Sequence, residues 1–246
     1  MASLAKQWKR ATKRVTMAWR HRLIADAPPW LRRIGGWPAS WADMLFIDHG
    51  VFRLAYLNKH RLSDVAWRSA QPAPHHIAQA ARTGIKTIIN LRGERQCGSY
   101  WLERAACARH GVQLVNYQVR SRAAPSKEEL WGAKQMLERV EYPILMHCKS
   151  GSDRAGLMSV LYKHVKLGVP IARAKRELSL RYGHIRQSDT GILDAFFERY
   201  LADTAGRPMA FFDWVDQVYD PAELKAKFVA KGWANKLVNG VVLRRE

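Results

Sequence analysis

The sequence predicts an α/β fold built on one central sheet, and three observations carry this prediction. Apolar runs with strand character alternate with helical segments between residues 63 and 205, which is typical of strands and helices stacked in layers. With 246 residues, 48% of them apolar, the chain is long enough to bury one good core. The last strand candidate leads through a small-residue loop directly into a helix. We therefore expect four to five mostly parallel strands with helices on both faces.

Four segments of this zone have strand character. The most distinct is Lys86–Leu91, which is β-branched and apolar and is expected to be buried. Each segment is short, as strands in globular proteins usually are. In chain order, the expected strands are Val65–Ser69, Lys86–Leu91, Val112–Val119 and Pro143–His147.

Helix signals fill the intervals between these strands. Gly84 and Gly111 are placed to end the first two helices. Ser126 and Glu129 form a Ser-x-x-Glu capping box at the start of the third. The expected helices are Pro74–Thr83, Tyr100–His110, Ser126–Val140 and Ala155–Lys166, followed by two more over 170–182 and 189–203.

A basic, tryptophan-rich zone, residues 1–62, precedes this pattern. Its apolar residues recur at helical spacing as far as Pro28-Pro29, and a second helix is expected over 38–60. Aromatic rings among lysines and arginines are typical of a helix lying on an anionic membrane, so we expect residues 1–33 to contact such a surface. The alternative is that the zone packs on the following domain. Half of the ten tryptophans lie here: Trp8, Trp19, Trp30, Trp37 and Trp41.

The C-terminal zone, residues 206–246, combines an aromatic cluster with a basic helix from Pro221 and a basic tail. Two interpretations stay open, a helical cap on the preceding domain and a second surface-seeking element. The aromatic residues of the cluster are Phe211, Phe212, Trp214 and Tyr219.

The formal net charge of +20 favours anionic partners such as acidic lipid surfaces or phosphorylated ligands. Nucleic acid is not expected, because no binding motif for it is recognisable. The chain has no apolar stretch long enough to span a membrane and no signal-peptide pattern. Its three cysteines have neither a disulfide framework nor zinc spacing. We expect a cytoplasmic protein with reduced thiols and peripheral contact with the inner face of the membrane.

The segment His147–Arg154 has the composition and the position of an anion-binding site. A small-residue loop that enters a helix directs backbone N–H groups and the positive end of the helix dipole at one point. Cys148 lies in this positive field, which favours the nucleophilic thiolate. Arg154, six positions later, can hold two phosphate oxygens in its planar fork. Phosphoryl transfer needs little beyond such positioning and charge neutralisation.

The sequence His-Cys-x5-Arg at a strand-to-helix turn resembles the signature loop of the protein tyrosine phosphatase superfamily. Two upstream segments, Trp67–Pro72 and Ile89–Glu94, resemble its bacterial and fungal dual-specificity-like branch. The resemblance covers roughly residues 65 to 200. It implies a tyrosine phosphatase-like fold with a helical N-terminal extension and a C-terminal tail, and a reaction that needs neither metal nor cofactor.

The resemblance also implies roles within the loop. Cys148 is the expected nucleophile that forms a phosphocysteine intermediate, and Arg154 is expected to stabilise the transition state. His147 is expected to orient the loop without touching substrate. The expected phosphate-binding residues are Lys149, Ser150, Gly151, Ser152, Asp153 and Arg154.

The chain departs from the family pattern in two places. The general acid of the family is usually an aspartate on a separate loop, but the matching segment, Gln118–Pro125, has no carboxylate. Asp153, just before the arginine, is the best substitute; alternatively it only orients Arg154 or caps the next helix. Ala155 stands where most members have Ser or Thr, which predicts slower hydrolysis of the phosphoenzyme.

These observations lead to a cysteine-dependent phosphatase acting on a lipid-linked phosphate at a membrane surface. Lys149, next to the cysteine, suits a multiply charged substrate of this kind. The alternative substrate is phosphotyrosine or phosphoserine/threonine on a protein. A second alternative is a catalytically weak, phosphate-binding pseudophosphatase, which the missing acid and Ala155 would explain.

Overall fold

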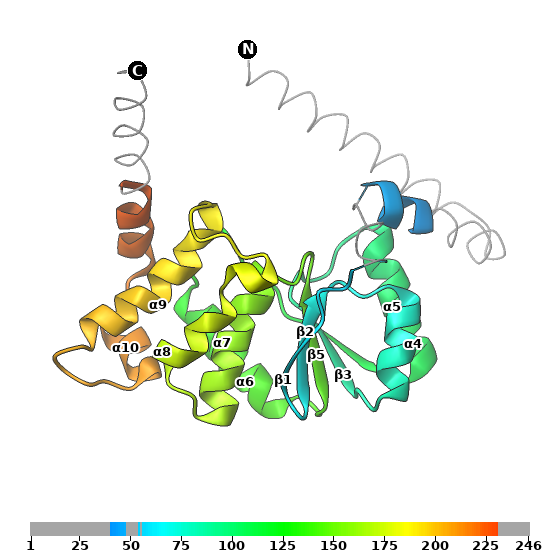
Figure 1. Cartoon of the computed structure of the whole chain (residues 1–246), viewed down its shortest axis with the longest axis horizontal. Coiled ribbons are helices and arrows are strands. Elements are labelled where there is room, and N and C mark those ends of the chain that lie inside the picture. Colours follow the sequence, from blue (N-terminus) through cyan, green and yellow to red (C-terminus); the bar gives the residue numbers. More distant parts are fainter. Residues whose placement is uncertain (1–39, 48–53, 55, 231–246) are drawn as a thin grey trace, which may run out of the picture.

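The computed structural model describes residues 40–47, 54 and 56–230 (Figure 1). The expected membrane-contacting helix within residues 1–33 and the basic tail after residue 230 lie outside these ranges. Among the helices of the described residues, none is both long enough and apolar enough to cross a membrane.

A five-stranded sheet with the order β1-β2-β5-β3-β4 forms the centre of the molecule. Four strands are parallel, namely β2 (Ala66–Ala70), β5 (Ile144–Cys148), β3 (Thr87–Asn90) and β4 (Gln113–Asn116), while the edge strand β1 (His60–Ser63) is antiparallel to β2. The prediction of four to five mostly parallel strands is confirmed. The strand β1, with the sequence HRLS, was not predicted.

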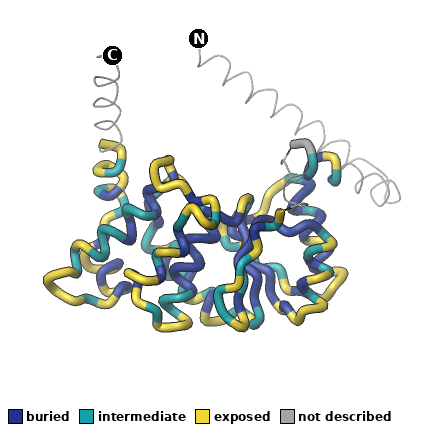
Figure 2. Tube along the Cα trace, viewed as in Figure 1, coloured by how far each residue is buried: buried dark blue, intermediate teal, exposed yellow. Residues whose placement is uncertain are grey.

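Helices cover both faces of this sheet, as expected (Figure 1). One face carries α4 (Pro74–Arg82) and α5 (Gly98–His110), and the other carries α6 (Lys127–Arg139) and α7 (Asp153–Leu167). Successive residues of β3 point to opposite faces, so Ile88 packs with α4 and α5 while Ile89 packs with α6 and α7. The sheet is thus buried on both sides (Figure 2).

The helix boundaries follow the local signals closely. Gly111, which follows α5, has the left-handed backbone, with φ 66°, that ends many helices. The Ser126 side chain accepts a hydrogen bond from the Glu129 N–H, and the Glu129 carboxylate accepts one from the Ser126 N–H. This reciprocal pair is the predicted capping box at the start of α6.

The helix expected over residues 170–182 is wrong as a continuous element. Only α8 (Ile171–Ala174) is α-helical, and the 3-10 turns η2 (Lys175–Glu177) and η3 (Leu180–Tyr182) follow it. The Leu178 backbone leaves the helical region, with ψ 87°, and its buried side chain packs against Gly156 of α7. The carbonyl of Glu177 accepts a hydrogen bond from Arg68 of β2. Tertiary contacts therefore override the helical pattern of this segment.

The helix expected over 189–203 is present as η4 (Asp189–Gly191) followed by α9 (Ile192–Asp203).

The second N-terminal helix, expected over residues 38–60, is only partly correct. Residues 40–42 are α-helical and η1 (Asp43–Ile47) is a π-helical turn, but residues 56–59 are irregular and His60 begins β1. Asn58 has a φ of 48°, and the Leu57 carbonyl accepts a hydrogen bond from Ala70 N–H of β2. Only His60–Ser63 thus joins the sheet as a strand, with Leu57 hydrogen-bonded to β2, and the boundary expected between residues 62 and 63 falls inside β1.

The C-terminal aromatic cluster is part of the core. Phe211 and Trp214 of α10 (Phe211–Gln217) are buried against Phe196 of α9, and Tyr219 is buried beside them. The Tyr219 hydroxyl also donates a hydrogen bond to the Pro125 carbonyl. These contacts favour the interpretation of this segment as a cap over the one that makes it a surface-seeking element.

Candidate active site

The loop between β5 and α7 lies at the carboxyl edge of the parallel strands, where α/β sheets commonly bind ligands. β5 ends at Cys148, which pairs with Ala70 at the end of β2, and α7 begins at Asp153. Cys148 is buried, with 2% of its surface exposed. The thiol therefore sits below the N-terminus of a fifteen-residue helix, with the positive end of the helix dipole directed toward the loop.

The shape of this loop requires glycine at position 151. Gly151 has a φ of +79°, which disfavours any residue with a side chain. A Cβ atom there would lie 2.7 Å from the Ala70 backbone nitrogen and 2.8 Å from the Ser69 carbonyl carbon. Gly151 thus lets the loop pass directly against the end of β2.

Four consecutive backbone carbonyls of the loop, those of residues 149–152, accept hydrogen bonds from residues outside the loop. The Lys149 carbonyl accepts from Gln71 N–H at 3.5 Å, and the Ser150 carbonyl accepts from Asn58 Nδ2 at 2.9 Å. Arg68 Nη2 donates to the carbonyls of Gly151, at 2.7 Å, and Ser152, at 2.9 Å. In a trans peptide the N–H points opposite to the carbonyl. The N–H groups of residues 150–153 therefore turn to the other side of the loop, as an anion cradle requires.

Arg68 makes two of these four hydrogen bonds to the loop carbonyls. Its side chain is completely buried, its Nη1 donates to the Glu177 carbonyl and carboxylate, and its guanidinium lies 4.1 Å from the Tyr182 ring centroid. Burial lowers the pKa of Arg68, whereas Glu177 raises it. The carboxylate of Glu177 also pairs with Lys163 at 2.5 Å. A buried ionic cluster thus ties β2, the loop and η2 together.

His147 lies at the end of β5, directly before Cys148, and is buried. It is fully buried, and its Nε2 lies 2.5 Å from the Glu103 carboxylate of α5. Gln71 donates to the same carboxylate at 2.7 Å and accepts a hydrogen bond from Arg92. This buried polar chain fixes the end of β5 against α5.

Arg154 stands at the edge of a cavity of about 600 Å³ that opens above the loop. Burial is the main cause that lowers the pKa of Arg154, and Cys148 opposes it, since a thiolate nearby favours the charged guanidinium. The cavity is strongly cationic. Its lining residues are Arg95, Gln118, Val119, Arg120, Ser121, Arg122, Ala123, Lys149, Ser150, Asp153, Arg154 and Thr190.

The segment that lacks the expected aspartate does line this cavity, and it presents cations there. Arg120 forms two hydrogen bonds to Glu129, at 3.0 and 3.1 Å, while Arg122 is exposed. The Glu129 carboxylate is occupied by this pair and by the helix cap.

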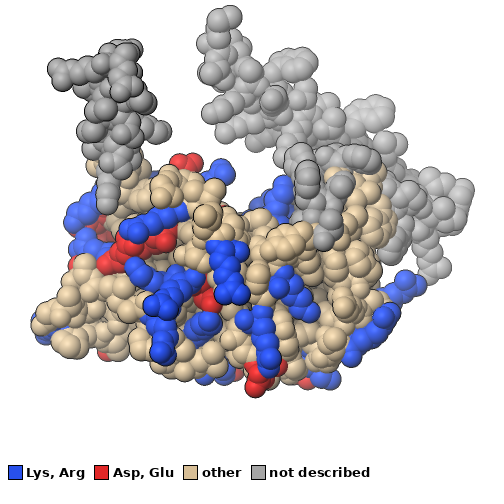
Figure 3. All heavy atoms as spheres, in the orientation of Figure 1, with Lys and Arg blue, Asp and Glu red and all other residues tan. Residues whose placement is uncertain are grey.

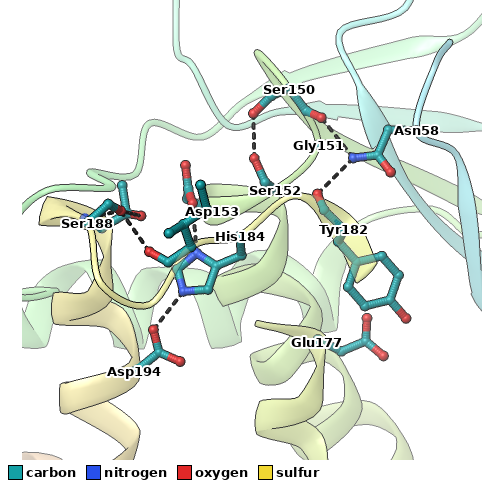
Figure 4. A network of polar contacts seen from close by, with 12 residues as sticks. Asn58, Ser150, Gly151, Ser152, Asp153, Glu177, Tyr182, His184, Ser188 and Asp194 are labelled. Carbon is teal, nitrogen blue, oxygen red and sulfur yellow. Dashed lines mark hydrogen bonds and ion pairs between the residues drawn. The ribbon is translucent and has the colours of Figure 1, made fainter. Parts of the chain in front are cut away.

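Asp153 lines the same cavity and is held by a buried histidine (Figure 4). His184 Nδ1 lies 2.7 Å from Asp153 Oδ1, and His184 Nε2 lies 2.6 Å from Asp194 Oδ2. Sequence reasoning missed His184 and Asp194, as it missed Asn58 and Arg68. These residues lie far from the loop in the chain, and the sequence gives no local signal for them.

The other two cysteines lie apart from the loop in the sequence. Cys97 precedes α5, and Cys107 is buried between α5 and the sheet, where burial raises the pKa of its thiol to about 12. Such a thiol stays protonated and unreactive at neutral pH. Within the described residues, no three His, Cys, Asp or Glu side chains are grouped so that they could hold a metal ion.

Comparisons with known proteins agree with this geometry. Residues 55–192 match the family model described as "DSP-PTPase phosphatase fused to NAD+ Kinase". Over 114 residues the chain is 31% identical to the dual specificity protein phosphatase TpbA of Pseudomonas aeruginosa strain UCBPP-PA14, which is 46% of this chain and 49% of TpbA. The chain thus spans about half the length of the curated relatives that it matches.

Solved structures show the same fold. A crystal structure of P. aeruginosa TpbA superposes with a TM-score of 0.51 at 22% identity, covering 65% of this chain and 89% of that one. A crystal structure of a TpbA variant in complex with pTyr superposes with a TM-score of 0.50 at 23% identity, covering 65% and 88%. At this level of identity the likeness concerns the fold.

Proposed function

This chain belongs to the family of dual-specificity-type tyrosine phosphatases described as "DSP-PTPase phosphatase fused to NAD+ Kinase", and from that membership we propose that it hydrolyses phosphate monoesters at the loop 148–154. The observation that carries the proposal is the arrangement of the loop. Four carbonyls are held outward, the buried Cys148 lies at the end of β5, and Arg154 borders the cavity. These are the parts that phosphoryl transfer needs.

In the first step, the Cys148 thiolate attacks phosphorus and the bond to the leaving oxygen breaks. Arg154 and the N–H groups of residues 149–154 stabilise the charge on the phosphoryl oxygens. In the second step, water attacks the phosphocysteine, inorganic phosphate leaves and the thiolate is restored. We assign Asp153 as the acid of the first step, because it is the carboxylate in the lining of the cavity. Residue 155 is alanine, which supplies no hydroxyl to help the thiolate leave, so we expect the second step to be slow.

For the substrate we propose a lipid-linked phosphate at a membrane surface. Four cations besides Arg154 line the cavity, which suits a multiply charged substrate, and the whole chain has a net charge of +20. Contact of residues 1–33 with an anionic membrane is part of this proposal. The cavity-lining cations are Arg95, Arg120, Arg122 and Lys149.

A phosphoprotein is the alternative substrate. TpbA, the dual specificity phosphatase similar to this chain, has been crystallised as a variant with pTyr. The second alternative, a phosphate-binding protein with negligible turnover, is favoured by Ala155 and by the lack of a carboxylate in the segment 118–123.

The test is phosphate release by the full chain from anionic phospholipid vesicles, a phosphotyrosine peptide and a soluble aryl phosphate. We expect turnover by the wild type and none by Cys148→Ser, which should still bind phosphate-bearing ligands. Cys107→Ser is the matched control, since that thiol is buried away from the loop, and it should keep activity.

Each outcome decides between the alternatives. Preference for vesicles would support the lipid substrate, and preference for the peptide would replace it with a phosphoprotein. Turnover by Cys148→Ser would contradict the nucleophile assignment. A wild type that binds these ligands without releasing phosphate would establish the phosphate-binding alternative.

A further inference from the structure

A buried histidine joins the candidate acid to a second carboxylate on another helix (Figure 4). His184 follows η3 and is only 2% exposed. Its ring lies between Asp153 in the first turn of α7 and Asp194 in the first turn of α9, with both contacts at 2.7 Å or less. Each contact uses one oxygen of a carboxyl group, and that oxygen can accept a hydrogen bond even when the other oxygen of Asp153 carries the acidic proton. Both ring nitrogens therefore donate, and a histidine that donates from both nitrogens is a cation.

The charge of this imidazolium follows from its surroundings. Burial alone would lower the pKa of His184, but the hydrogen bonds to Asp153 and Asp194 outweigh burial and raise the pKa to about 9. Arg154 follows Asp153 in the chain, and two further sets of charged groups line the cavity beside Asp153 and a second cavity, of about 440 Å³, whose lining includes His184 and Asp194. These sets are Arg95, Arg120, Arg122 and Lys149 on the Asp153 side, and Lys175, Arg176, Arg186 and Glu198 on the Asp194 side.

We propose that His184, fixed by Asp194, is the positioning residue of the acid Asp153: it holds this carboxyl group at the cavity edge and stabilises the carboxylate formed by proton donation. This inference rests on the proposed phosphatase activity. His184 does not touch substrate in this role, because its two ring nitrogens are both occupied by carboxylates.

The path of the proton through the reaction shows at which step His184 acts. When Cys148 attacks, the S–P bond forms, the P–O bond breaks and the proton of Asp153 passes to the leaving oxygen, so an alcohol departs and Asp153 becomes a carboxylate. The imidazolium 2.7 Å away stabilises that product state. When water attacks the phosphocysteine, its proton returns to Asp153 and the S–P bond breaks. One carboxyl group thus gives and regains one proton, while His184 keeps its own.

Two substitutions separate the charge of His184 from its hydrogen bonds. His184→Asn keeps an amide donor near the position of Nδ1, toward Asp153, and His184→Gln keeps one near Nε2, toward Asp194. Both remove the positive charge. His164→Gln is the matched control, because His164 lies near the opposite end of α7 and contacts the Val169 carbonyl.

We expect both His184 variants to lose about tenfold or more in kcat on an alkyl phosphate, whose leaving group needs the acid, and less than about threefold on an aryl phosphate. His184→Asn should position Asp153 better than His184→Gln does and should therefore keep the higher kcat. His164→Gln should match the wild type.

Equal losses on both substrates, with no difference between His184→Asn and His184→Gln, would overturn the inference and leave only a structural role for His184. A normal leaving-group dependence in Asp153→Asn would overturn it as well, while the phosphatase activity would stand. If the wild type releases no phosphate from any substrate, both proposals fail. An NMR titration of the His184 ring, done on the same protein, tests the bridge separately: titration near the ordinary value of 6.5 would contradict it.

Discussion

At the scale of single residues, the site depends on charged and polar side chains that are distant in the sequence. Cys148, Asp153 and Arg154 could be predicted because they share one short motif, and the structure brings them to one loop. Asn58 could not, because it holds the loop across 92 residues of chain and carries no local pattern of its own. The same holds for His184, whose partner Asp153 lies 31 positions away. Sequence reasoning thus found the groups proposed for the chemistry and missed those that support them.

His184 should make the stability of the fold depend on pH. Its pKa in the folded protein, about 9, lies above the ordinary 6.5, so its stabilising effect is complete below pH 6.5 and is lost as pH rises toward 9. Between pH 6 and pH 9, the wild type should lose about 3 kcal/mol of unfolding free energy that His184→Gln does not lose. Urea unfolding of both proteins at the two pH values measures this difference. Equal pH dependence in the two proteins would show that His184 is not a buried cation.

At the scale of elements, local patterns predicted most helices and strands, and tertiary contacts decided the exceptions. The apolar run of β3 and the capping box of α6 are local signals, and both elements formed as expected. β1 has one apolar residue in four, and only its pairing with β2 makes it a strand. The helix expected over 170–182 breaks where Arg68 takes the Glu177 carbonyl and Leu178 turns into the core.

Arg68 joins three elements, so its replacement should disturb the loop more than the sheet. Arg68→Lys keeps the charge, but a single ammonium cannot reach both Glu177 and the loop carbonyls as a planar fork does. We expect binding of vanadate, a phosphate analogue, to weaken about tenfold, which is about 1.4 kcal/mol. Arg68→Met, which leaves Glu177 buried with only Lys163, should cost about 3 kcal/mol of stability.

Vanadate inhibition and thermal unfolding measure the two effects. Arg61→Lys is the matched control, because Arg61 lies on β1 and its side chain is 63% exposed. Wild-type vanadate affinity in Arg68→Lys would mean that the loop keeps its shape without the fork.

At the scale of the whole molecule, the composition predicted one hydrophobic core and a positively charged surface that attracts anions. On the face shown in Figure 3, Lys and Arg side chains cover more of the surface than Asp and Glu side chains do. The C-terminal aromatic cluster could not be assigned from the sequence, because the same residues suit a core and a membrane interface equally well. Burial of Phe211, Trp214 and Tyr219 against α9 decides in favour of the core.

The cationic cavity should make vesicle turnover sensitive to salt. Raising the ionic strength from about 0.01 M to 1 M shortens the Debye length from about 30 Å to 3 Å, which screens attraction to a charged surface. Hydrolysis in anionic vesicles should therefore fall much more steeply with salt than hydrolysis of a soluble aryl phosphate. Arg122→Gln, at the cavity, should reduce vesicle turnover more than Arg82→Gln, which changes the net charge equally but lies on α4.

Parallel salt profiles for the two substrates, or equal effects of the two arginine variants, would argue against a charged surface as the place of action.

The supports of the loop come from both ends of the described fold, and this has a consequence for the order of events during synthesis. Asn58 and Arg68 leave the ribosome long before Cys148, but their partners Tyr182 and Glu177 follow it. His184, which contacts Asp153, and its second partner Asp194 follow it too. A nascent chain that has just exposed Cys148 lacks these later partners. Contacts between residues so far apart in sequence also form slowly. The loop therefore takes its described shape only after these later residues have been made, so an incomplete chain that ends soon after Cys148 lacks the folded loop.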